Sequence, residues 1–99
     1  MNSDVYNDII RISQDLRQDE PDPLIKTKIN AVQRGLISLM SDNRSFIEEL
    51  FKEETRLKIE WLVYSWHKDD LPGSNMEADD AAKTLKKIIK QLSKPTQSV

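Results

Sequence analysis

The chain of 99 residues contains no cysteine. This absence excludes disulfides, Cys-ligated zinc, iron–sulfur clusters and thiol nucleophiles. The single histidine, His67, excludes sites that need several His ligands, and two glycines are too few for a glycine-rich phosphate-binding loop. No apolar run approaches the roughly 18 residues of a membrane span. The first residues are polar and acidic, unlike a signal peptide, so we expect a cytoplasmic protein that needs no cofactor and no metal.

The chain also lacks a large excess of either positive or negative charge. Charged residues make up 32% of the chain, but 17 acidic and 15 basic residues nearly cancel. No overall field therefore exists to attract nucleic acid or anionic lipid. The charges are nevertheless segregated, because residues 1–22 hold six acidic and two basic residues (net −4), whereas residues 23–41 hold three basic and none acidic (net +3). Such segregation favours attraction between neighbouring helices, or provides a recognition surface.

Apolar residues recur at helical spacing in four segments. The pattern predicts helices over residues 3–18, 23–40, 45–68 and 75–93, within one domain of residues 1–94 that a disordered tail of residues 95–99 follows. Asp22 before Pro23 is typical of a helix start. A polar break is expected at residues 41–44, before a capping box formed by Ser45 and Glu48, and a second capping box is expected at Ser74 and Glu77. Short links and the absence of strand patterns predict an all-α four-helix bundle with antiparallel up-down-up-down order.

Gly35 lies inside the second predicted helix. A glycine at an interior position costs about 1 kcal/mol relative to Ala. Two interpretations stay open: the glycine permits close approach of another helix, or it has no special role.

The aromatic segment of residues 57–66 is apolar in most directions around a helix. It is therefore either the enclosed central helix of the bundle or a helix with an extra face for a partner. Because Trp and Tyr are enriched in binding hot spots, the second interpretation gives a set of candidate interface residues. They are Trp61, Tyr64, Trp66 and His67, with Phe46 and Phe51 in support.

We therefore expect a small non-enzymatic protein that acts through protein–protein interaction or self-association, as a regulator, an inhibitor or immunity-type protein, or a subunit of an assembly. One alternative is a nucleic-acid-associated protein that contacts phosphates through Lys83, Lys87, Lys90 and Lys94 of the last helix. Nucleic acid is the weaker hypothesis because this set lacks arginine and aromatic residues. A metal or catalytic site built from carboxylates is less favoured still, since no spacing of Asp and Glu calls for one.

Overall fold

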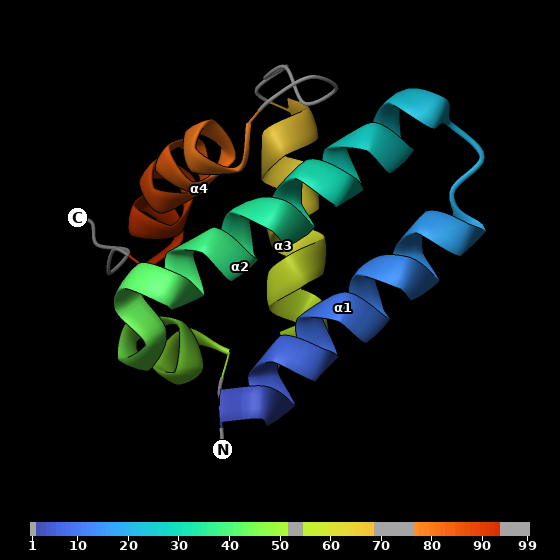
Figure 1. The fold of residues 1–99 in the computed structure, drawn as a ribbon. Coiled ribbons are helices and arrows are strands. Elements are labelled where there is room, and N and C mark those ends of the chain that lie inside the picture. The colour runs from blue at the N-terminus through green and yellow to red at the C-terminus, as the bar shows by residue number, and fades with distance from the viewer. Residues whose placement is uncertain (1, 52–54, 69–76, 94–99) are drawn as a thin grey trace.

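Four helices make up the part of the chain that the structure, a computed structural model, describes: residues 2–51, 55–68 and 77–93. They are α1 (Asn2–Asp19), α2 (Pro23–Leu50), α3 (Thr55–Lys68) and α4 (Ala78–Ser93) (Figure 1). These described ranges contain no strand. The chain is all-α, as the sequence predicts.

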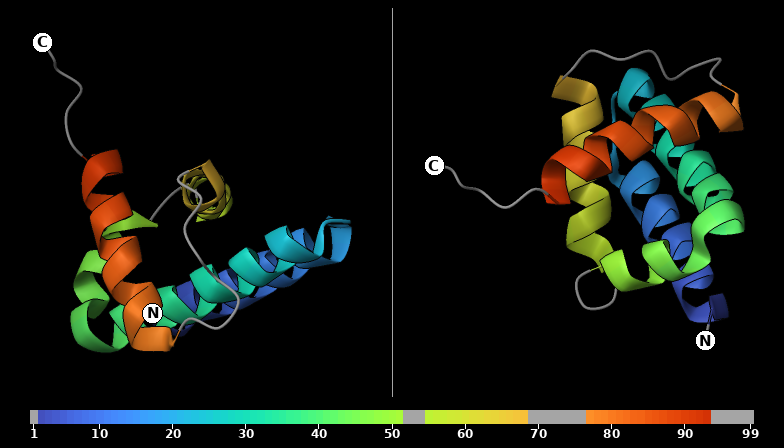
Figure 2. Two further views of the ribbon diagram at one scale, coloured as in Figure 1. Left: turned by 90° about the horizontal axis from the view of Figure 1, so that it is seen from above. Right: turned by 90° about the vertical axis from the view of Figure 1, so that its left-hand side faces the viewer.

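The helices pack around one core, with α2 in contact with each of the other three. Among the described residues, α1 and α4 make no contact with each other. Figure 1 shows α1 beside α2 and running in the opposite direction, whereas α3 crosses behind both. From above, α3 is seen nearly end-on against one face of the α1–α2 pair (Figure 2, left). The up-down-up-down order of all four helices stays a prediction.

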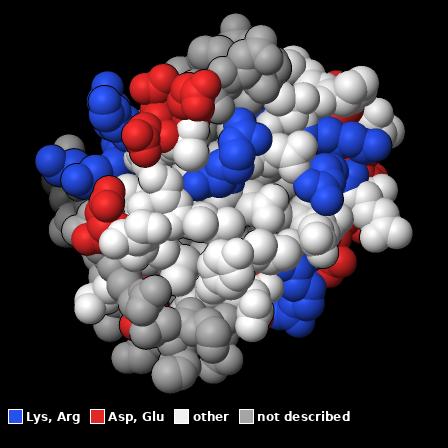
Figure 3. All heavy atoms as spheres, viewed as in Figure 1, with Lys and Arg blue, Asp and Glu red and all other residues white. Residues whose placement is uncertain are grey.

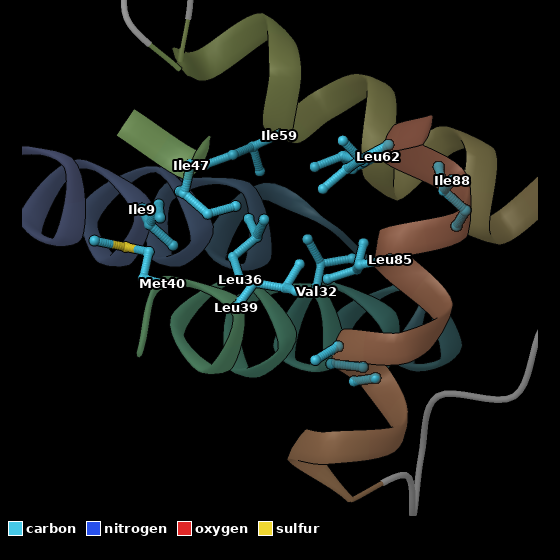
Figure 4. Close-up of a cluster of buried hydrophobic side chains, with 14 of the residues drawn as sticks. Ile9, Val32, Leu36, Leu39, Met40, Ile47, Ile59, Leu62, Leu85 and Ile88 are labelled. Carbon is cyan, nitrogen blue, oxygen red and sulfur yellow. The ribbon is translucent and has the colours of Figure 1, made fainter. Parts of the chain in front are cut away.

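The core is built from the apolar stripes that the sequence predicts. Ile9 and Ile12 of α1 are buried, and Val5 and Leu16 pack against the same cluster. The stripes of α2 and α4 meet them in the interior (Figure 4). The buried residues of α2 and α4 are Ile29, Ala31, Val32, Leu36, Leu39, Met40, Ile47, Ala81, Ala82, Leu85, Ile88 and Ile89.

The predicted start of α2 is confirmed. The Leu24 amide donates to the Asp22 carboxylate over 2.9 Å, and the Lys26 amide donates to the Asp22 carbonyl over 3.0 Å. Asp22 is therefore the N-cap, and Pro23 takes the first helical position, where its missing amide hydrogen would have no partner.

The predicted break at residues 41–44 is corrected to a bend. α2 continues to Leu50, so Ser45 and Glu48 lie inside this helix and not at the start of the next. The Ser41 hydroxyl donates to the Ile37 carbonyl over 3.3 Å, a contact that satisfies the side chain within the helix and bends it. The ribbon of α2 turns at this point (Figure 2, right). The predicted helix of residues 45–68 is thus divided between the end of α2 and α3.

At the other end of the chain, α4 begins at Ala78, and the Ala81 amide donates to the Glu77 carbonyl over 2.9 Å. Ser74, the first residue of the second predicted capping box, lies outside the described residues, as does the predicted tail of residues 95–99.

Gly35 permits the close packing of α2 against α4. A Cβ atom at this position would lie 2.5 Å from Cδ1 of Leu85 and 3.1 Å from the backbone carbonyl of Ala81. The Leu85 methyl group could rotate away from an added Cβ atom, but the Ala81 backbone could move away only if the whole of α4 shifted. The first of the two interpretations of Gly35 therefore holds.

We predict that Gly35→Ala destabilises the protein. Overpacking a core typically costs about 1–3 kcal/mol, and the better helix propensity of Ala returns about 1 kcal/mol, so the net loss should be about 1–2 kcal/mol. Urea unfolding followed by far-UV circular dichroism measures it. Lys26→Ala, an exposed change in the same helix, should stay within about 0.5 kcal/mol. A Gly35→Ala variant as stable as the parent would contradict the packing of α4 on Gly35.

Candidate protein-interaction surface

Helix α3 has two apolar faces. Ile59, Leu62 and Trp66 point into the core, and each is almost completely buried. Val63 lies between the faces and packs partly against the core. The remaining large apolar residues of the helix are exposed, so α3 is not enclosed on all sides.

The exposed residues form one continuous face. The exposed fractions are 47% for Leu57, 56% for Trp61 and 60% for Tyr64. Their spacing of four and then three residues places them on the same side of the helix. We call these three residues the outer face of α3. Among the described residues, the other exposed large apolar side chains are Tyr6 on α1 and Leu24 on α2, and single apolar residues of that kind are ordinary on protein surfaces.

The structure separates the six candidate interface residues into different environments. Trp61, Tyr64 and His67 are exposed on α3. Trp66 and Phe51 belong to the buried core, where a partner cannot reach their side chains. The side chain of Phe46 lies outside the described residues. Leu57 was missed in the sequence, although its position four residues before Trp61 is a signal that it shares the same face.

A groove borders the outer face of α3. It has a volume of about 280 Å³ and lies between α3 and the ends of α1 and α2 that meet at residues 20–22. Its apolar lining comes from all three helices: Leu16, Ile25, Ile29 and Val63. Its polar lining consists of Glu20, Glu60, His67 and the hydroxyl-bearing Tyr64. We call this site the groove.

The groove and the outer face of α3 are continuous. A second open hollow of about 290 Å³ is lined by Glu60, Trp61 and Tyr64, and two of these residues also line the groove. A single partner is therefore able to contact both.

Carboxylates dominate the charge beside the groove. The Arg56 guanidinium lies 3.3 Å from the Glu60 carboxylate and 3.4 Å from that of Asp15 on α1. One cation is thus shared between two anions, and the Glu20 carboxylate accepts a hydrogen bond from the Asp22 amide at the opposite wall. The guanidinium of Arg17, next to Leu16, donates to the Asn30 side chain of α2. Among the described residues that line the groove, Glu20 and Glu60 are acidic and none is Lys or Arg.

The lysines of the alternative hypothesis lie on α4. Lys83, Lys87 and Lys90 are exposed, and Lys94 lies outside the described residues. Asp79 and Asp80 are exposed in the first turn of the same helix. On the face shown in Figure 3, basic and acidic side chains are interspersed and form no continuous basic surface.

A search of the described residues for groups of three or more His, Cys, Asp or Glu able to hold a metal ion finds none. In that same part of the chain, no helix combines the length and the apolar character that crossing a bilayer requires.

No protein-family model, no curated protein and no solved structure matches the chain.

We predict that the two tryptophans contribute very differently to stability. Trp66→Ala removes a fully buried side chain and should lower the free energy of unfolding by about 3–5 kcal/mol. Trp61→Ala removes a largely exposed side chain and should change it by no more than about 0.5 kcal/mol.

Urea unfolding curves of the two variants and the parent give the comparison. If Trp66→Ala leaves too little folded protein to fit a baseline, Trp66→Phe provides a smaller loss that is still measurable. Similar losses at positions 61 and 66 would contradict the division of α3 into a buried and an exposed face.

Proposed function

We propose that this protein works by binding another protein through the outer face of α3. The supporting observation is that Leu57, Trp61 and Tyr64 are all about half exposed on one side of a single helix. Burying a large apolar side chain completely is worth about 1.5–3 kcal/mol. Because the three side chains stay about half exposed after folding, a partner that covers them would be stabilised by the burial of their remaining apolar surface.

The residue types favour a protein partner. Trp and Tyr are the residues most enriched in binding hot spots, where a few central side chains supply most of the affinity. Trp61 and Tyr64 have this character, and Glu60 and His67 beside them are polar groups able to orient a partner. A regulator, an inhibitor or immunity-type protein, and a subunit of an assembly all use a surface of this kind.

No observation favours the nucleic-acid alternative over this proposal. The exposed lysines of α4 share their helix with Asp79 and Asp80, and acidic residues repel phosphate. Lys90, in the last turn of α4, also complements the negative C-terminal end of the helix dipole without any ligand.

The double variant Trp61→Ser/Tyr64→Ser tests the proposal. The full-length protein, immobilised, is used to capture proteins from cells of its source, and the double variant is compared with the parent. We expect specific captured proteins to be lost with the variant, because two hot-spot side chains are typically worth about 2 kcal/mol or more each. Sedimentation of the parent alone shows whether self-association uses the same residues.

Tyr6→Ser is the matched control, since Tyr6 is also an exposed aromatic residue but lies on α1 outside the groove and the outer face of α3. It should retain the captured proteins. A double variant that captures the same proteins as the parent would contradict the proposal, as would equal losses with the Tyr6 control.

A further inference from the structure

The groove has the shape and lining that an additional helix needs. Three helices supply its apolar lining, with Leu16 from α1, Ile25 and Ile29 from α2, and Val63 from α3. In the view from above, α3 stands against the α1–α2 pair with α4 on one side (Figure 2, left). A helix is a suitable occupant for such a groove because its own apolar stripe completes the helix-on-helix packing.

The charged residues of the groove indicate what flanks that stripe. Glu20 and Glu60 stand on opposite walls, and no Lys or Arg is among the described residues that line the groove. The Arg56 guanidinium is already shared between Glu60 and Asp15, and the Arg17 guanidinium donates to Asn30. The complementary partner therefore carries Lys or Arg on both sides of its apolar stripe.

A second copy of this chain does not offer such a helix. Among the described helices, α4 alone combines a strong apolar stripe with several flanking lysines. Its apolar residues Ala81, Leu85, Ile88 and Ile89 are buried in the core of the same molecule. Presenting them to another copy would require the core to open, so a different protein is the better occupant.

We infer that the groove beside α3 binds an amphipathic helix of another protein, whose apolar stripe lies on Leu16, Ile25 and Val63 and whose basic flanks lie beside Glu20 and Glu60. The inference rests on the proposed function and names the chemistry of the partner. Tyr64, and Trp61 in the adjoining hollow, then contact one flank of the bound helix.

Two synthetic peptides of about four helical turns test the inference. Both carry Leu at helical spacing, and their remaining positions carry Lys in one and Glu in the other. Titration into the full-length protein, followed by Trp fluorescence and by calorimetry, should show saturable binding of the Lys peptide. The Glu peptide should bind at least about tenfold more weakly, which corresponds to roughly 1.4 kcal/mol. Absence of saturable Lys-peptide binding, or equal affinities, would overturn the inference.

Tyr64→Arg and Tyr6→Arg form a matched pair that locates the binding site. Both replace an exposed Tyr by Arg, but only residue 64 lines the groove. We expect Tyr64→Arg to weaken Lys-peptide binding about tenfold or more, and Tyr6→Arg to leave it nearly unchanged. Equal effects of the two changes would show binding to the general surface and would overturn the inference.

A second matched pair separates groove charge from total charge. Glu20→Lys/Glu60→Lys should reverse the preference in favour of the Glu peptide. Asp42→Lys/Asp80→Lys alters the net charge equally at two exposed positions outside the groove and should keep the preference for Lys. Circular dichroism of each variant verifies the fold, and an unchanged preference in Glu20→Lys/Glu60→Lys would count against the groove.

Failure of the helix-binding inference is distinguishable from failure of the proposed function. If protein capture depends on Trp61 and Tyr64 but neither peptide binds, the outer face of α3 is an interface and the helix-binding inference alone fails. Self-association that disappears with Tyr64→Arg would also overturn the inference, because it would identify a second copy as the occupant.

Discussion

The close contact at Gly35 is the constraint that joins α4 to the central helix α2. Without a side chain at this position, the backbone of α4 at Ala81 lies against α2, and Leu85 fills the adjoining space. α2 also contacts α1 and α3, so each helix is placed against this central one. Since α1 and α4 do not meet among the described residues, they lie apart, and α3 packs across them with its inner face only. Its outer face is left exposed.

The division of α3 into two faces lets one helix contribute to the core and also present exposed aromatic residues. Ile59, Leu62 and Trp66 join the core, where their burial stabilises the fold. Trp61 and Tyr64 remain exposed, so polar residues at these positions would leave the core intact. Large aromatic side chains that folding does not use, gathered on one face, are characteristic of an interaction surface.

The sequence predicts the parts of the fold that depend on local signals. Asp22 and Pro23 mark the start of α2 because an N-cap is a contact between close neighbours in the chain. The apolar stripes of α1, α2 and α4 follow from helical periodicity in the same way. The end of α2 was not predictable, because the polar residues at 41–44 suit a bent helix as well as a loop, and the hydrogen bond from Ser41 to Ile37 favours the bend.

The candidate site was predictable only in part. A segment that is apolar in most directions does not reveal which residues face inward, so Trp66 and Trp61 look equivalent until the other helices are in place. The close approach at Gly35 depends on Ala81 and Leu85, which are more than forty residues away in the chain. The groove likewise combines residues from three helices, and no local pattern marks such a combination.

The walls of the groove and its charge have separate physical origins. The ion pair of Arg56 with Asp15 links α3 to α1, but both side chains are about half exposed, and such pairs contribute only about 0–1 kcal/mol. The position of α3 therefore depends mainly on the burial of Ile59, Leu62 and Trp66. The carboxylates of Glu20 and Glu60 are not part of the buried core, and in the proposed function they would act on partner choice and association rate. Under the same proposal, affinity would come from the apolar lining and from Tyr64, which borders both the groove and the outer face of α3. A partner that reached both surfaces would contact one helix whose orientation the core already fixes.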